Sequence, residues 1–218
     1  TLATLLRRLH LPGRHSLRHY LEQSYNTETI IKNSLGTFSI NAKNDSLTKS
    51  IPCFEYYHQP WLATPKTRGL FIDIGANIGF YSLLAIKRYG YQSAYAFEPN
   101  PETYDRLAKN IMLNNLTEAI QLHPIALSSK VGDTHFQANP THTGASSLSA
   151  TASDSTITVP TTTFDAFCKI EGITLSDISF IKIDVEGFEH DVLTGMQNAL
   201  SELPTGCCIF IESDPSHP

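Results

Sequence analysis

The sequence predicts an α/β protein with a doubly wound, mostly parallel sheet, and two observations carry this prediction. From residue 70 onward, short apolar runs of strand length alternate with segments whose apolar residues recur at helical spacing. Parallel strands need a crossover connection, usually a helix, so this alternation is typical of a parallel sheet. The chain has 218 residues, 41% of them hydrophobic, which is enough for one sizeable core.

The elements of this sheet are expected in a regular order. Apolar runs predict strands over residues 70–74, 93–97, 120–127, 180–183 and 208–211. Helical spacing predicts helices over residues 79–88, 101–114, 163–171 and 190–200, and Pro101 suits a first helical turn. Residues 128–163 are polar and rich in Ser, Thr and Gly, which predicts a hairpin near residues 133–137, a loop and a strand over residues 156–159.

Residues 1–66 are expected to form an N-terminal extension of helices and short strands, before a main domain over residues 67–218. Four leucines between residues 2 and 9 recur at helical spacing and predict a short amphipathic helix. A second helix is expected over residues 16–25, and short strand-like runs follow within residues 35–58. Prolines and charged residues over 60–68 are typical of a linker.

The charge of the chain and its distribution indicate which classes of binding partner are expected. The net charge is −5, which provides no basic field for nucleic-acid phosphates, so we expect no nucleic-acid partner. Residues 1–20 contain four arginines and no acid. This start favours a cap packed on the domain, with a transit peptide or a weak membrane-surface contact as the alternatives. It is too short and too charged to span a bilayer.

The four cysteines follow no metal-ligand spacing. Cys207 and Cys208 are adjacent, and neighbouring residues of a strand point to opposite faces. We therefore expect reduced thiols, a cytoplasmic location and no metal site.

The first segment with chemical meaning follows the strand over residues 70–74. Asp73 is followed by a turn of small residues that contains Gly75, Asn77 and Gly79 and opens a helix. Gly allows close approach of a ligand, and Asn tolerates left-handed dihedrals. An ordinary strand–helix turn is the alternative. The spacing differs from the dinucleotide G-x-G-x-x-G pattern, because Gly75 and Gly79 are four positions apart.

Two further segments place acids at strand ends. Glu98 follows the second strand, where a carboxylate can accept hydrogen bonds from ribose hydroxyls, or where it can simply favour a helix start. Asp184 and Glu186 follow the strand over residues 180–183, where an open parallel sheet places its ligand site. Base chemistry, hydroxyl binding and a divalent cation all remain open for this pair, as does a helix-start role for Glu186 and Glu189.

In this order, the segments resemble the FkbM family of S-adenosylmethionine-dependent methyltransferases. The resemblance runs from about residue 70 to residue 213 and rests on residues 71–83, 97–101, 125–128, 146–148, 159–165 and 181–189. It implies the class I methyltransferase, Rossmann-like fold and S-adenosyl-L-methionine as the cofactor. The implied reaction is O-methylation of a small-molecule or carbohydrate acceptor, such as a sugar, a glycan or a natural product.

The resemblance also implies roles for individual residues. The turn around the methionine part of the cofactor would contain Asp73, Gly75, Asn77 and Gly79. Glu98 would bind the ribose hydroxyls, with Pro99 and Asn100 beside it, and Ala126 and Leu127 would flank the adenine. Asp184 and Glu186 would be the catalytic carboxylates, bordering the methyl group and the acceptor.

Two departures from the general methyltransferase pattern matter. Ile125-Ala126 stands where many class I enzymes have Asp-Ala, which leaves adenine recognition to backbone groups. The class I sheet has two further strands after the one over residues 208–211, so the sequence looks truncated at its C-terminus. A methyltransferase-like binding domain without turnover and a nicotinamide-dependent oxidoreductase are the alternative functions, and the sequence says nothing about the oligomeric state.

Overall fold

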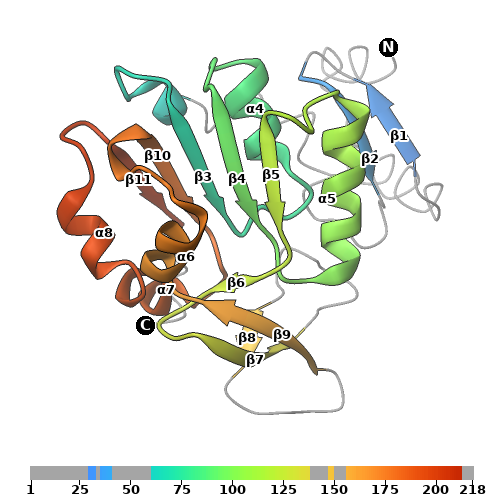
Figure 1. The fold of residues 1–218 in the computed structure, drawn as a ribbon. Coiled ribbons are helices and arrows are strands. Elements are labelled where there is room, and N and C mark those ends of the chain that lie inside the picture. The colour runs from blue at the N-terminus through green and yellow to red at the C-terminus, as the bar shows by residue number, and fades with distance from the viewer. Residues whose placement is uncertain (1–28, 33–34, 41–59, 138–146, 150–155, 213–218) are drawn as a thin grey trace, which may run out of the picture.

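A computed structural model describes residues 29–32, 35–40, 60–137, 147–149 and 156–212 (Figure 1). The helices predicted over residues 2–9 and 16–25 lie outside the described residues.

The central sheet has five parallel strands in the order β11-β10-β3-β4-β5. Their bounds are β3 Leu70–Ile74, β4 Ser93–Phe97, β5 Ile120–His123, β10 Ile178–Ile183 and β11 Cys208–Ile211. The chain adds strands outward from β3 to one edge and then returns to add strands beyond its other side. This is the doubly wound, Rossmann-like order, so the predicted fold class is confirmed. The order reverses between β3 and β10, and ligands of such sheets bind beyond the carboxyl ends of the strands at that point.

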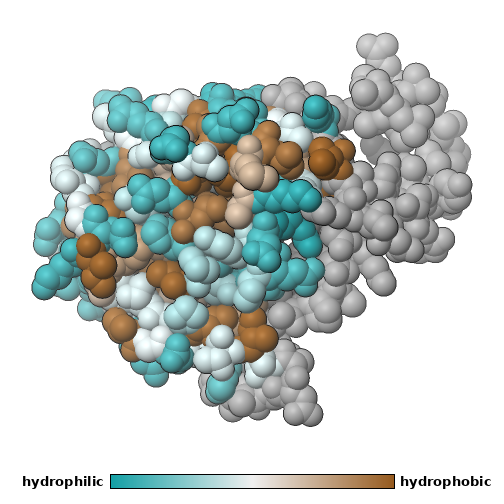
Figure 2. Space-filling view, turned by 45° about the vertical axis from the view of Figure 1, so that its right-hand side comes forward, coloured by the Kyte–Doolittle hydropathy of each residue, from teal (hydrophilic) through white to brown (hydrophobic). Residues whose placement is uncertain are grey.

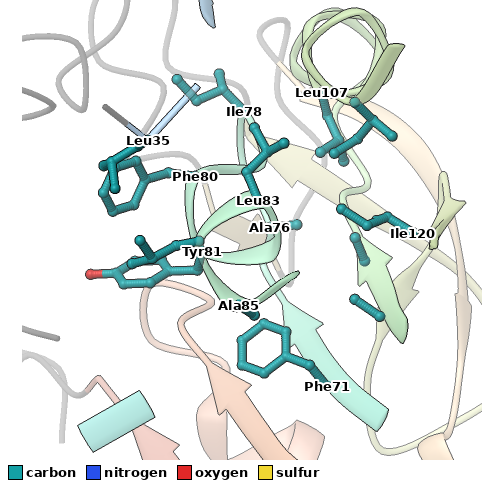
Figure 3. Packing of buried hydrophobic residues seen from close by; sticks show 14 of the residues in the cluster. Leu35, Phe71, Ala76, Ile78, Phe80, Tyr81, Leu83, Ala85, Leu107 and Ile120 are labelled. Atoms are coloured by element: carbon teal, nitrogen blue, oxygen red, sulfur yellow. The ribbon is translucent and has the colours of Figure 1, made fainter. Parts of the chain in front are cut away.

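Helices cover both faces of this sheet (Figure 1). The helix bounds are α4 Phe80–Lys87, α5 Pro101–Leu113, α6 Phe164–Glu171, α7 Glu189–Thr194 and α8 Gln197–Glu202, and a 3-10 turn η3 spans Leu175–Asp177. Phe71 of β3 points into a core with α4 and α5, while its neighbour Ile72 points into the core on the side of α6 and α8. Alternate strand residues thus feed two separate cores, and Figure 3 shows the first of them around α4.

Two predicted elements differ from the structure, one in where it ends and one in being divided. The strand predicted over residues 120–127 stops at His123, because Pro124 has no backbone N–H for the ladder. The helix predicted over residues 190–200 is two helices, α7 and α8, with Gly195 between them. A Cβ at Gly195 would lie 2.0 Å from the carbonyl oxygen of Ser128, so the chain at this position touches another loop closely.

A second, four-stranded sheet lies beyond the carboxyl ends of β3, β4 and β5 (Figure 1). Its strands are β6 Ala126–Leu127, β7 Gly132–Gln137, β8 Ser147–Ser149 and β9 Thr156–Thr162, in the order β6-β9-β7-β8. Residues 133–137, near which a hairpin is predicted, all belong to strand β7, which pairs antiparallel with the next strand, β8, and also with β9 along its whole length. Turn residues alone did not reveal the pairing with β9, because β9 is not the next strand after β7 in the chain.

The described part of the predicted extension packs on the central domain. Strands β1 (Thr29–Lys32) and β2 (Thr37–Ile40) pair antiparallel, and the Ser39 backbone N–H donates to Oδ1 of Asn110 on α5 over 2.6 Å. Phe38 and Leu62 are fully buried in the same core as α4. Leu62 belongs to a 3-10 turn, η1 Pro60–Ala63, so part of the predicted linker is packed. The domain boundary at residue 66 stays a prediction.

The outer surface mixes polar and apolar side chains. On the face in Figure 2, apolar residues are interspersed with hydrophilic ones. Large exposed apolar side chains lie on different elements, for example Met112 on α5, Ile170 on α6 and Ile209 on β11. Among the described residues, no helix combines the length and the apolar character needed to cross a membrane.

Candidate functional site

The turn after β3 has the backbone geometry that its glycines suggest. Gly75, Asn77 and Gly79 all have left-handed φ angles, of 76°, 50° and 86°. A Cβ at Gly75 would lie 1.9 Å from the carbonyl oxygen of Asp184, and one at Gly79 would lie 2.5 Å from Leu107 of α5. Glycine is therefore favoured at both positions by φ, and at Gly75 it is also required for space, because the neighbouring atom there belongs to the backbone. The turn is pressed between the loop after β10 and α5.

Glu98 connects this turn to the end of β4. Its carboxylate accepts a hydrogen bond from the backbone N–H of Asn77 over 2.9 Å and another from that of Asn100 over 3.0 Å. The residue is only 6% exposed. Burial raises the pKa of Glu98 to about 7, although the two backbone donors and the Lys182 ammonium oppose the shift. A carboxylate that changes charge near neutral pH thus lies at the carboxyl edge of the sheet.

Pro99 and Asn100 continue from Glu98 into α5. The side chain of Asn100 accepts from the Glu102 backbone N–H and caps the helix N-terminus, and Pro101 occupies the first turn. The Asn100 side chain is therefore engaged within the protein, and its backbone N–H is what reaches the Glu98 carboxylate.

Asp73 lies beneath the turn rather than on its surface. Its side chain is fully buried, and Oδ2 accepts a 2.6 Å hydrogen bond from the Ser82 hydroxyl on α4. Oδ1 lies 3.5 Å from the ammonium group of Lys182. The carboxylate thus joins β3, α4 and β10 from inside.

Lys182 is the site residue that sequence reasoning missed. It is 1% exposed on β10, and its Nζ donates to the Gly75 carbonyl oxygen over 3.0 Å. Nζ also lies 3.2 Å from Oδ2 of Asp184 and 5.1 Å from the centre of the Tyr81 ring. Burial disfavours the charged lysine, but Asp184 and Asp73 outweigh this effect and raise its pKa above the usual value. The available signal was a lysine inside an otherwise apolar strand, two residues before an acid.

The loop after β10 brings Asp184 to the turn after β3, whereas Glu186 in the same loop is exposed. The Asp184 backbone N–H donates to the Ile74 carbonyl oxygen over 3.1 Å, and its side chain is 27% exposed. Glu186 is exposed and has a φ of 52°. Glu189 acts as a support for the loop, because its carboxylate accepts from the backbone N–H groups of Val185 and Gly187.

Ala126 and Leu127 form strand β6 and are both buried. They pair with Thr161 and Thr162 of β9, in the small sheet beyond the ends of β3, β4 and β5. Their side chains fill protein cores, so any ligand contact there would have to come from their backbone groups.

No group of three or more His, Cys, Asp or Glu side chains in the described part of the chain is placed to hold a metal ion. Of the predicted site, the turn residues, Glu98 and Asp184 are directly linked by hydrogen bonds or close approach. Ala126 and Leu127 lie apart from them in the small sheet, and Glu186 lies at the exposed side of the loop after β10.

Comparison with known proteins gives a consistent assignment. A family model described as a methyltransferase FkbM domain matches residues 73–218. The hexuronic acid methyltransferase AglP of Haloferax volcanii is 31% identical over 131 residues, which cover 60% of this chain and 51% of AglP. Methyltransferase sdnD of Sordaria araneosa is 33% identical over 87 residues, which cover 40% of this chain and 34% of sdnD. The chain thus spans about half or less of these two relatives.

Among solved structures, the methyltransferase FkbM from Methylobacillus flagellatus KT is similar with a TM-score of 0.43 and 17% identity, over 87% of this chain and 46% of that chain. The family model covers well over half of the sequence, including all three segments that follow β3, β4 and β10. This protein belongs to the FkbM family of methyltransferases.

Proposed function

We propose that this protein is an S-adenosyl-L-methionine-dependent O-methyltransferase that acts on a hydroxyl group of a sugar, a glycan or a natural product. The observation that carries the proposal is the carboxylate of Glu98, which is hydrogen-bonded to the turn after β3 at the carboxyl edge of the sheet. Membership of the methyltransferase family supports the reaction class.

The chemistry of these residues fits the cofactor. The left-handed backbone at Gly75, Asn77 and Gly79 leaves the turn without bulky side chains, so a ligand can approach its backbone. Glu98 has the position of the acid that accepts ribose hydroxyls in doubly wound folds. Acidic groups outnumber basic ones among the buried Asp73, Glu98 and Lys182, which favours a cationic sulfonium. Backbone groups of Ala126 and Leu127 would flank the adenine, with Pro99 and Asn100 next to the ribose.

The proposed chemistry at the acceptor is a proton transfer combined with in-line displacement. The bound cofactor supplies an electrophilic methyl group with a good leaving group, so the protein mainly aligns the acceptor. Asp184 or Glu186 would accept the proton of the acceptor hydroxyl, and the cofactor, when bound, would supply the methyl group and the sulfur leaving group. Asp184 is the better placed of the two, because its backbone is bonded to the end of β3.

The acceptor class follows from a relative. AglP is named for hexuronic acid, and we extend this to a carbohydrate acceptor here. We also propose a cytoplasmic protein whose reaction needs neither a metal ion nor a nucleic-acid partner.

The test is transfer of a labelled methyl group from S-adenosylmethionine to a panel of hexuronic acids, neutral sugars and phenolic compounds. We expect label on a sugar hydroxyl, loss of most activity in Asp184→Asn, and unchanged activity with a chelator. The exposed Glu118→Gln serves as the matched control. Tight S-adenosylhomocysteine binding without transfer to any acceptor would instead favour a binding domain, and binding of NAD alone would favour an oxidoreductase.

A further inference from the structure

The ammonium group of Lys182 is buried inside the protein, where the charged form of a side chain is energetically unfavourable. An isolated ammonium group inside a protein is strongly disfavoured, so a buried lysine usually has specific partners. Here the partners are the Gly75 carbonyl at 3.0 Å, Asp184 Oδ2 at 3.2 Å and Asp73 Oδ1 at 3.5 Å. The ammonium group thus donates a hydrogen bond to the Gly75 carbonyl and forms ion pairs with two carboxylates, of which Asp73 Oδ1 has no hydrogen-bond partner.

The three partners belong to the two loops that border the proposed cofactor site and to the strand that leads into one of them. Gly75 begins the turn after β3, and Asp184 begins the loop after β10. These loops already touch, since the position of a Cβ at Gly75 is filled by the Asp184 carbonyl. An apolar side chain in place of Lys182 would leave the Gly75 carbonyl and the Asp184 carboxylate without their common donor. Close packing and the hydrogen bond from the Asp184 N–H to the Ile74 carbonyl bring the loops together, while the ammonium group orients their polar groups.

We propose that Lys182 is a positioning residue of the cofactor site, whose buried ammonium group fixes the turn at Gly75 relative to the carboxylate of Asp184 and balances the acidic groups around it. This inference rests on the cofactor site proposed above, and it adds a residue that need not touch the cofactor itself.

The charge of Lys182 also affects the pKa of Glu98. A change in that pKa would therefore report the loss of the charge, which a loss of packing alone would not produce. The charged groups acting on Glu98 are Lys182, which lowers its pKa, and Asp73, which raises it. The other influences are its burial and the backbone N–H groups of Asn77 and Asn100. Removing the Lys182 charge should therefore move the titration of Glu98 to higher pH.

The experiment measures S-adenosylhomocysteine affinity by calorimetry between pH 5.5 and 9 in wild type, Lys182→Met and Lys182→Arg. Lys182→Met is expected to bind about tenfold more weakly at pH 8, which is about 1.4 kcal/mol, the lower range for a lost charged hydrogen bond. Its pH midpoint should move upward, while Lys182→Arg should keep the midpoint because it keeps the charge. The exposed Lys169→Met on α6 is the matched control and should behave as wild type.

A second variant covers the case in which Lys182→Met does not fold. Asp73→Asn combined with Lys182→Met removes both buried charges, and such neutral replacements are often tolerated. It should bind more weakly than wild type because Gly75 and Asp184 have lost their donor, with a midpoint near that of wild type because the removed charges act on Glu98 in opposite directions. Wild-type affinity in either the single or the double variant, once it is shown to be folded, would overturn the inference. Absence of S-adenosylhomocysteine binding in wild type would overturn the proposed site itself.

Discussion

Replacing Glu98 with Gln separates the charge of this side chain from its size. The carboxylate now accepts from two backbone N–H groups, those of Asn77 and Asn100. Gln keeps the shape but has one acceptor oxygen and one amide nitrogen, so one of these buried donors loses its partner. The variant also loses the charged acceptor that we propose for the ribose hydroxyls.

The magnitude follows from these contacts. A hydrogen bond to a charged group contributes about 1.5–3 kcal/mol, so S-adenosylhomocysteine should bind about 10- to 150-fold more weakly at pH 8. In wild type, binding to the ionised form should weaken about tenfold for each pH unit below the Glu98 pKa of about 7. The variant has no carboxylate at this position, so its affinity should stay nearly constant from pH 5.5 to 8.

The pH dependence of the free energy of unfolding, measured without ligand, provides an independent check on the raised pKa of Glu98. The folded pKa of Glu98 is raised from 4.5 to about 7, so its contribution is fully present below pH 4.5 and is lost as the pH rises through 7. The loss amounts to about 3 kcal/mol at 1.36 kcal/mol per pKa unit. Glu98→Gln should lack this decline.

The assay is calorimetric titration across this pH range, paired with urea denaturation of the unliganded protein. Glu118→Gln, an exposed acid beyond α5, is the control and should keep both wild-type profiles. Wild-type affinity in Glu98→Gln at pH 8, or a variant that keeps the wild-type pH profile, would refute the assignment of Glu98 to the ribose.

Three further predictions follow from buried contacts. Gly75→Ala should destabilise the protein and abolish S-adenosylhomocysteine binding, because its φ is 76° and the new Cβ would meet the Asp184 carbonyl; a melting temperature and affinity equal to wild type would contradict this. Asn110→Ala should cost about 1–3 kcal/mol, measured by urea denaturation, because it removes the buried hydrogen bonds that the Asn110 side chain makes with the Ser39 N–H and the Ile78 carbonyl; an unchanged midpoint would show that β2 does not depend on α5. His123→Phe should stabilise the fold more at pH 5 than at pH 8. Burial lowers the pKa of His123, so its contribution is lost as the pH falls through its titration range, and its Nε2 is buried without a hydrogen-bond partner; equal effects at both pH values would disprove this.

Much of the central sheet was predictable because its strands are short apolar runs, of which β3 and β10 are buried on both faces, and because helical segments separate them. The predictions over residues 70–74 and 93–97 match β3 and β4, and Pro101 marks the start of α5 as expected. The predicted bounds were wrong where a proline or a contact with a distant loop interrupts a local apolar pattern. An apolar run continued past Pro124, and a helical pattern continued through Gly195, where the chain packs against the Ser128 carbonyl.

The features of the candidate site also fall into those that the sequence predicted and those that it did not. Glycines, an asparagine and acids directly after buried strands could be identified from spacing, because parallel strands bring their carboxyl ends to one edge. Spacing could not reveal that Asp73 is turned inward to Ser82, nor that the Asn100 side chain caps a helix. It also could not identify Lys182, whose partner Gly75 lies 107 residues away in the chain.

Local periodicity and short motifs predicted the succession of strands and helices along the central sheet, the family resemblance, and the position of the turn and of the acids at the strand ends. Which of those polar groups meet, and what charge surrounds them, depends on how distant segments pack together. The Lys182 ammonium lies between Asp73 and Asp184, and Glu98 accepts from the turn, because β3 pairs with both β10 and β4. Strand pairing and burial, which act between residues far apart in the chain, set the electrostatics on which binding depends.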